Sequence, residues 1–244
     1  EYAAHFEAAR GRAAVGEKTP AYLYFPWIAE AIHRNLGEGI KLIAVLRNPV
    51  ERACSHYWFN VARFIETKSF ERALELEEER LAHDTHFARV FSYRDRGFYM
   101  RQIRRYLPLF PRENMRFYIA EEIYREPERF LREVCGFLGV DPEFDFQPWL
   151  ARKNVAPVPK LLGLHQALSH VHVFVRRYTP KWRILHKPVT LFLRALPWHP
   201  DRGVMPMKPE TREGLREGYL QDVRELEEFL GVDLGRWWPD FARS

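Results

Sequence analysis

The stretch from Lys41 to Tyr57 constrains the fold most, because its pattern changes from strand to helix within two residues. Residues 41–46 (Lys-Leu-Ile-Ala-Val-Leu) form a nearly unbroken apolar run, which is typical of a parallel strand covered on both faces. Asn48 suits a helix N-cap, Pro49 suits the first helical position, and Glu51 stands near the place of the acid in a capping box. The stretch therefore predicts a strand that runs directly into a helix.

The same junction carries two groups that bind phosphate. Arg47 falls at the carboxyl end of the predicted strand, where open α/β sheets bind ligands. Ser55 lies seven residues after Asn48, about two helical turns, so these two residues share one helix face. A guanidinium and a hydroxyl placed in this way can hold one phosphate dianion from two sides. We therefore expect Arg47 and Ser55 to form an anion site.

The other patterns along the chain predict a layered α/β fold. A second strand is expected at residues 114–120, followed by Glu121 and Glu122. Two strands joined by crossover helices form a parallel sheet that helices cover. Further helices are expected from Pro26, over residues 70–82, from Pro127 to the Phe137-Leu-Gly-Val segment, and over residues 209–230.

Length and composition predict a single domain, residues 1–244, with a substantial core, since 46% of the residues are hydrophobic. The chain starts at Glu1 and contains no apolar run long enough to span a membrane. We therefore expect an N-terminally incomplete, cytoplasmic protein. Cys54 and Cys135 both fall in predicted helices, and free thiols are expected there in preference to a disulfide or a metal site.

Positive charge is concentrated between Phe146 and Pro200, where the chain has nine basic residues and no acidic one. Such a block predicts an anionic partner, which is a nucleotide phosphate, an acidic polymer or a membrane surface, unless it is simply a solvated face. We interpret residues 155–205 as a flap on the acceptor side, as an amphipathic segment that contacts a membrane through residues 168–198, or as ordinary core and surface. The histidines here lack the spacing and partners of a metal site.

Several motifs together resemble one family. Arg47-Asn-Pro-x-x-Arg-x-x-Ser55 resembles the 3′-phosphate-binding element of sulfotransferases that use 3′-phosphoadenosine 5′-phosphosulfate (PAPS). Gly16-Glu-Lys-Thr-Pro-x-Tyr22 resembles the segment that precedes this strand in heparan-type and many bacterial sulfotransferases, where the lysine lies in the catalytic cleft. Gly97-x-Tyr99 and the strand–Glu-Glu–helix block of residues 114–140 are also similar to the family.

The resemblance implies a P-loop-NTPase-like three-layer sandwich, with a short parallel sheet flanked by helices and an extra helical C-terminal region. It implies in-line transfer of a sulfuryl group from PAPS to a hydroxyl or an amine, with adenosine 3′,5′-bisphosphate as product and no metal. Lys18 would then be catalytic, and Arg47 and Ser55 would hold the 3′-phosphate. Tyr99 would lie near the adenosine, unless it is a core tyrosine. A basic loop with Arg152 and Lys153 would close over the nucleotide.

Two parts of the family pattern are absent, namely the glycine-containing loop that cradles the phosphosulfate and the catalytic glutamate. Both would precede Glu1, so we expect missing residues there. His5 and His56 are the visible substitutes for the base, although we expect His56 to pack or to face another way. Two other classes stay open: a kinase-like P-loop enzyme with Glu121 or Glu122 at Mg²⁺, and a non-catalytic module that binds anionic polymer or membrane. The acceptor, whether saccharide, lipid, peptide tyrosine or small molecule, and the oligomeric state are unspecified, and no nucleic-acid partner is expected.

Overall fold

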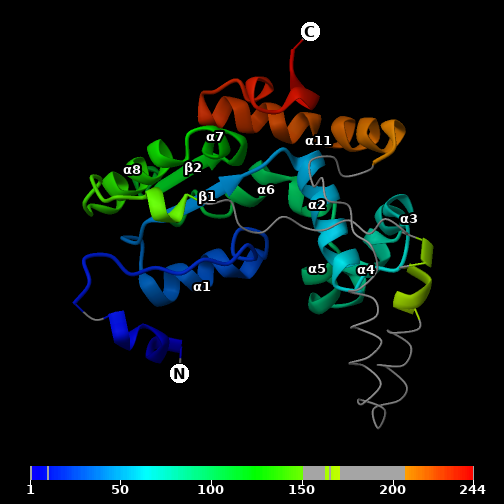
Figure 1. The fold of residues 1–244 in the computed structure, drawn as a ribbon. Coiled ribbons are helices and arrows are strands. Elements are labelled where there is room, and N and C mark those ends of the chain that lie inside the picture. Colours follow the sequence, from blue (N-terminus) through cyan, green and yellow to red (C-terminus); the bar gives the residue numbers. More distant parts are fainter. Residues whose placement is uncertain (1, 10, 151–162, 165, 171–206, 244) are drawn as a thin grey trace. The chain divides into compact units, whose positions relative to one another are not determined.

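The computed structural model describes residues 2–9, 11–150, 163–164, 166–170 and 207–243 (Figure 1). Most of the predicted flap, 155–205, and of the stretch 168–198 lies outside these residues, so both stay predictions. The contacts group into two compact units, each assembled from distant segments of the chain. The first unit comprises Glu1–Arg47, Tyr99–Lys153 and Glu225–Ser244, and the second comprises Asn48–Phe98 and Asn154–Arg224.

The first unit is built on two parallel strands, β1 (Leu42–Leu46) and β2 (Met115–Ile119). Leu42 pairs with Met115, and Leu46 pairs with Ile119. Both predicted strands are confirmed to within a residue at each end. Because the strands are parallel and in this register, the residues that follow Leu46 and Ile119 leave the sheet at the same edge.

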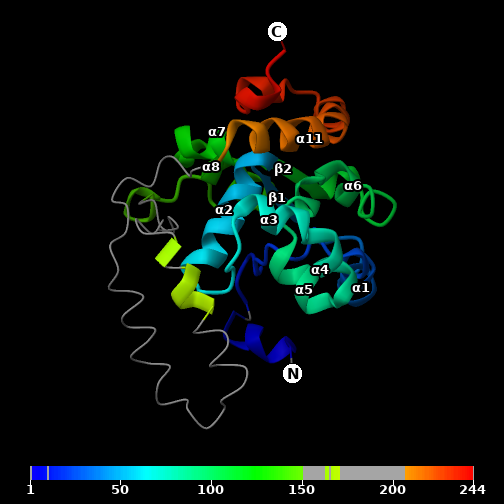
Figure 2. The ribbon, with the colours of Figure 1, turned by 90° about the vertical axis from the view of Figure 1, so that its right-hand side faces the viewer.

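Helices cover the two faces of this sheet. Ala29 of α1 (Pro26–Leu36) belongs to a buried cluster with Tyr106, Phe110 and Met115. Side chains alternate between the faces of a strand, and on the other face the ring of Tyr118 packs edge-on against Phe130 of α8 (Pro127–Leu138). The sheet therefore lies between α1 and α8, which is the predicted three-layer arrangement (Figures 1 and 2).

One expectation about β1 is wrong for the described residues. The strand was predicted to be covered on both faces, but Ile43 and Val45 are 39% and 51% exposed. On this face of the sheet α8 packs against β2, through the contacts of Arg116 with Phe137 and of Tyr118 with Phe130. None of the described residues buries the alternate side chains of β1.

Short elements complete the first unit. The helix α8 ends at Gly139, which lies in the left-handed region (φ 77°) as a helix C-cap often does. The described short helices of this unit are η1 (Tyr2–Ala9), α6 (Tyr99–Ile103), η3 (Arg112–Asn114), α7 (Ala120–Arg125), η4 (Gln147–Trp149), η6 (Leu234–Arg236) and η7 (Pro239–Phe241).

The second unit is helical and contains α2 (Pro49–Ala62), α3 (Phe70–Glu75), α4 (Glu77–His83), α5 (Thr85–Phe91) and η2 (Asp95–Gly97). It also holds the first part of α11 (Pro209–Leu230), the predicted amphipathic helix, which continues into the first unit. The single charged helix expected over residues 70–82 is divided at Leu76. Directly after this division, the buried carboxylate of Glu77 accepts hydrogen bonds from the backbone N–H groups of Arg94 and Asp95, both at 2.7 Å.

A buried polar network holds the second unit together. The carboxylate of Glu66 is 1% exposed, pairs with Arg80 at 2.6 Å and accepts a hydrogen bond from the Tyr93 hydroxyl at 2.9 Å. The side-chain amide of Asn60 donates to the same hydroxyl at 2.9 Å. A buried carboxylate is tolerated when it is paired and hydrogen-bonded in this way, so the network fixes how α2, α4 and the segment after α5 pack.

Two further observations concern the described residues as a whole. Cys54 in α2 and Cys135 in α8 are both free, as predicted. None of the helices that the structure describes is long and apolar enough to cross a bilayer.

Candidate functional site

The strand-to-helix junction forms as the sequence predicts. Asn48 caps α2, because its side-chain oxygen accepts hydrogen bonds from the N–H groups of Val50 at 3.0 Å and Glu51 at 3.5 Å. Pro49 occupies the first helical position. The capping box does not form, since the Glu51 carboxylate instead pairs with Arg212 of α11. The cap fixes where α2 begins, two residues after Arg47.

Arg47 is the first residue after β1 and is half-buried. Within the described part of the chain, no side chain or backbone group forms a hydrogen bond or ion pair with its guanidinium. The Arg47 backbone is held, because its carbonyl oxygen accepts a hydrogen bond from the Tyr99 hydroxyl at 2.8 Å. A fixed backbone with a cation that the described residues leave unpaired suits the binding of an anion at the strand end.

Tyr99 is 5% exposed and begins α6. Its ring lies against that of Trp238, with centroids 6.3 Å apart. The contacts that the structure gives Tyr99 are therefore with protein groups, and its predicted place near the adenosine stays a prediction.

Ser55 lies in the second turn of α2 and is half-buried. Among the described residues, none shares a hydrogen bond with its hydroxyl. Arg47 ends the first unit and Ser55 belongs to the second. That the two hold one phosphate together stays a prediction.

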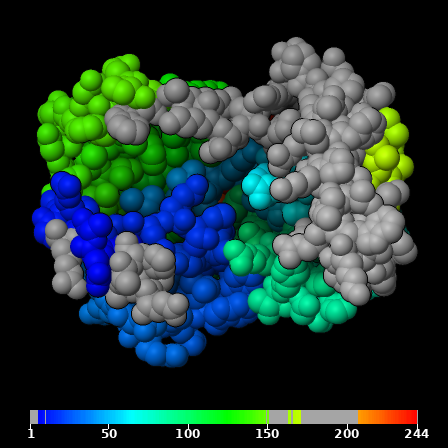
Figure 3. Space-filling view, turned by 60° about the horizontal axis from the view of Figure 1, so that its bottom comes forward, coloured from blue at the N-terminus to red at the C-terminus, as the bar shows by residue number. Residues whose placement is uncertain are grey.

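Lys18 lies in an exposed segment between η1 and α1, and the N-terminal part of the chain, blue in the space-filling view, reaches the surface of the molecule (Figure 3). The loop has internal structure: the Thr19 hydroxyl accepts a hydrogen bond from the Ala21 N–H at 3.5 Å, and the Tyr22 hydroxyl donates to Glu17. No described residue pairs with the Lys18 ammonium. The other two basic residues predicted for the nucleotide, Arg152 and Lys153, lie outside the described residues.

Comparison with known proteins then decides the family. A family model described as a sulfotransferase domain matches residues 31–152, half of the 244-residue chain. The chain belongs to the sulfotransferase family. The matched region contains Arg47, Ser55 and Tyr99, whereas Lys18 precedes it.

Individual relatives agree with this assignment. Heparan sulfate glucosamine 3-O-sulfotransferase 6 of Mus musculus is 29% identical over 64% of this chain and 47% of its own length. The Homo sapiens protein of the same name is 29% identical over 68% of this chain and 51% of its own length. The chain thus spans about half the length of these curated relatives. A crystal structure of a sulfotransferase from Alicyclobacillus acidocaldarius superposes with a TM-score of 0.68 at 29% identity, covering 97% of this chain and 72% of that one.

His56, a visible substitute for the base, is unsuited to that role in this sulfotransferase structure. It lies in α2, packs edge-on against the ring of Tyr93, and its Nδ1 atom is buried without a hydrogen-bond partner. Burial and the nearby charges of Arg52 and Arg96 lower its pKa from the usual 6.5 to about 3. A group with this pKa stays neutral at physiological pH but is too weak a base to hold the acceptor's proton.

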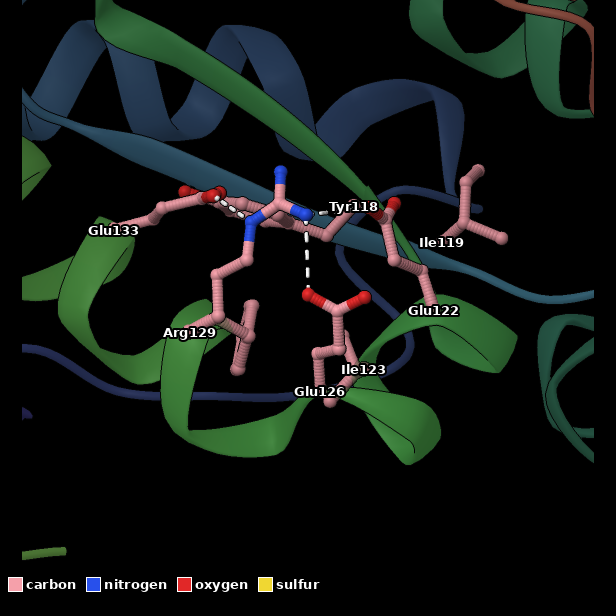
Figure 4. A pocket seen from close by; sticks show the side chains of 8 residues that line it. Tyr118, Ile119, Glu122, Ile123, Glu126, Arg129 and Glu133 are labelled. Carbon is pink, nitrogen blue, oxygen red and sulfur yellow. Dashed lines mark hydrogen bonds and ion pairs between the residues drawn. The ribbon is translucent and has the colours of Figure 1, made fainter.

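A small cavity between β2, α7 and α8 holds no anion site (Figure 4). Its volume is about 20 Å³, enough for roughly one water molecule. The guanidinium of Arg129 at its mouth is already bonded to Glu133 at 2.9 Å and Glu126 at 3.1 Å, and Glu122 lies 3.8 Å away. In the described ranges, no group of three or more His, Cys, Asp and Glu side chains is arranged to hold a metal.

Sequence reasoning missed Trp238. This side chain is fully buried, and its indole N–H donates to the carboxylate of Glu121, just after β2, at 2.9 Å. The only signal was a pair of adjacent tryptophans, Trp237 and Trp238, in a segment that was expected to pack. Nothing local in the sequence connects that segment to the end of the sheet.

Proposed function

We propose that this protein transfers a sulfuryl group from PAPS to a hydroxyl or amine acceptor. In this reaction a bond forms between the acceptor atom and sulfur while the bond from sulfur to the 5′-phosphate oxygen breaks, and the acceptor's proton passes to a base. The single observation that carries the proposal is the Arg47 side chain. It follows a parallel strand directly, it is half-buried, and the described residues leave its guanidinium unpaired.

The roles of the other residues follow from their chemistry. Arg47 and Ser55 would hold the 3′-phosphate, the group that distinguishes PAPS from ATP, through charge-assisted hydrogen bonds. Lys18, an exposed ammonium on a loop, would stabilise the sulfonyl oxygens or orient the acceptor. Arg152 and Lys153 would add positive charge around the nucleotide. The reaction resembles phosphoryl transfer, in which positioning and charge stabilisation supply most of the catalysis.

A kinase-like reaction is not favoured. The acidic pair after β2 would have to bind Mg²⁺, but Glu121 accepts the indole hydrogen bond of Trp238 and Glu122 lies 3.8 Å from the guanidinium of Arg129. Both carboxylates therefore already contact other side chains of the protein.

A saccharide is the acceptor class to test first. Support comes from the names of the two curated relatives above, which specify a heparan sulfate glucosamine for those proteins. Lipid and small-molecule hydroxyls are the alternatives, and assays of sulfate transfer from radiolabelled PAPS to each class would separate them.

The decisive experiment is calorimetric binding of adenosine 3′,5′-bisphosphate to the full-length protein. Arg47→Ala removes a charge-assisted contact, so we expect the binding free energy to weaken by about 1.5–3 kcal/mol. Arg34→Ala is the matched control, because Arg34 is an exposed arginine of α1. Unchanged affinity in Arg47→Ala would refute the assignment of the phosphate site, and with it the proposed donor.

A further inference from the structure

A chain of contacts links the carboxyl ends of the two strands in the first unit. At the end of β1, the Arg47 carbonyl accepts the Tyr99 hydroxyl hydrogen bond at 2.8 Å. Beyond the end of β2, the Glu121 carboxylate accepts the indole hydrogen bond of Trp238 at 2.9 Å. The rings of Tyr99 and Trp238 lie against each other, with centroids 6.3 Å apart. Arg47 and Tyr99 are 52 positions apart in the chain, and Glu121 and Trp238 are 117 positions apart. The fold thus brings both pairs to one edge of the sheet.

This chain of contacts is buried, and further hydrogen bonds hold Trp238 in place. Trp238 is 0% exposed and Tyr99 is 5% exposed. The backbone N–H of Trp238 donates to the carbonyl of Leu234 at 2.7 Å, and the N–H of Leu234 donates to the Glu227 carboxylate at 2.8 Å. Hydrogen bonds between buried groups are directional, and losing one partner leaves the other unsatisfied. The indole therefore fixes the Tyr99 ring, and the Tyr99 hydroxyl fixes the Arg47 carbonyl.

We infer that Tyr99 and Trp238 are positioning residues for Arg47, so that the C-terminal segment tunes the affinity of the nucleotide site without touching the nucleotide. The inference rests on the proposed function, in which Arg47 binds the 3′-phosphate. A flexible arginine must lose freedom when it binds, whereas an arginine with a fixed backbone has already lost part of it. A binding group is placed precisely only when the residues packed against it hold it in position.

The test uses Tyr99→Phe, which removes only the hydroxyl that bonds Arg47. Affinities for adenosine 3′,5′-bisphosphate and for adenosine 5′-monophosphate are measured by calorimetry on the full-length protein, together with the melting temperature. We expect the bisphosphate to bind about fivefold more weakly, which is the effect of one lost hydrogen bond. The monophosphate, which lacks the group that Arg47 holds, should bind as it does to the wild type. Trp238→Phe, which keeps a ring but loses the indole N–H, should shift the bisphosphate affinity in the same direction.

Tyr106→Phe is the matched control. Tyr106 is 6% exposed in the same unit, and its hydroxyl also donates to a backbone carbonyl, that of Tyr22, at 2.5 Å. It should lower the melting temperature as Tyr99→Phe does, but leave the preference for the bisphosphate intact.

The possible outcomes distinguish a failure of this inference from a failure of the proposed function on which it rests. If the wild type binds the two nucleotides equally, the 3′-phosphate site itself is wrong. If the wild type prefers the bisphosphate and Arg47→Ala abolishes the preference while Tyr99→Phe and Trp238→Phe keep it, only the positioning role is wrong. A loss of affinity for both nucleotides in equal measure would likewise overturn it, because it would show a purely structural effect.

Discussion

At the scale of single residues, the Gly97-x-Tyr99 motif has a packing explanation for its glycine. A Cβ atom on Gly97 would lie 2.5 Å from the ring carbons of Tyr219, closer than side-chain atoms approach one another. Tyr219 is 0% exposed, and its hydroxyl donates to the carbonyl of Arg94 at 2.7 Å. Because the Tyr219 ring is buried and its hydroxyl is hydrogen-bonded, the ring cannot move aside to make room for a Cβ atom on Gly97.

Gly97→Ala should therefore destabilise the protein by about 1–3 kcal/mol, as other overpacked sites do. Urea unfolding of the variant would measure this. Gly218→Ala is the control, because Gly218 lies inside α11 and an added Cβ there meets no atom within 4 Å. That change should stabilise by about 0.4–1 kcal/mol, since alanine restricts the unfolded chain. Equal stabilities of the two variants would show that the Tyr219 contact is not tight.

At the scale of elements, the capped start of α2 is the feature that sets the backbone after Arg47. Asn48→Ala removes the acceptor for the Val50 and Glu51 N–H groups, so we expect it to lower the free energy of unfolding by about 0.5–2 kcal/mol. Asn48→Ser, which keeps a capping oxygen, should restore most of the loss. Thermal unfolding of the three proteins tests this; a serine variant as unstable as the alanine variant would mean that some other property of Asn48 matters.

The elements that were predictable from sequence are those that neighbouring residues determine. The strand β1, the Asn48 cap and Pro49 are adjacent in the chain, and so are α8 and its C-cap Gly139. Arg47 could be assigned to the strand end for the same reason.

The features that were not predictable depend on partners far along the chain. Next to the division at Leu76, the carboxylate of Glu77 accepts hydrogen bonds from the backbone N–H groups of residues 94 and 95, which no local pattern predicts. Glu51 pairs with Arg212, a partner 161 positions away, instead of forming the capping box. The contact of Tyr99 with the Arg47 carbonyl is likewise invisible to local patterns, since it requires the folded first unit. Rules based on periodicity and capping consider only residues close together in the sequence, so they cannot predict such pairs.

At the scale of the whole molecule, stability depends on pH through groups whose pKa differs between the folded and unfolded chains. Burial and the charges of Arg52 and Arg96 lower the folded pKa of His56 to about 3, against the weaker influence of the backbone of Ser92 and Val90, which raises it. Burial also raises the folded pKa of Glu77, opposed by its hydrogen bonds to the backbone of Arg94 and Asp95. The two groups act in opposite directions, so their contributions must be separated by mutation.

The sign for His56 follows from where its proton binds. The unfolded chain protonates this histidine near pH 6.5, whereas the folded chain keeps it neutral down to about pH 3. Its contribution to stability is therefore fully present above pH 6.5 and is lost as the pH falls toward 3, by at most about 1.4 kcal/mol per pH unit. Glu77 works in the other direction, since its raised pKa favours the folded chain as the pH falls toward its unfolded value near 4.5.

Because Glu77 is unchanged in a His56 variant, comparison of wild type with His56→Phe isolates the histidine. Urea unfolding at pH 7.5 and pH 5.5 should show that the wild type loses about 1 kcal/mol more than the variant between these two values. If His56→Phe instead follows the wild type across this range, His56 takes up its proton in the folded protein, and the second unit is open enough around α2 to solvate a charge.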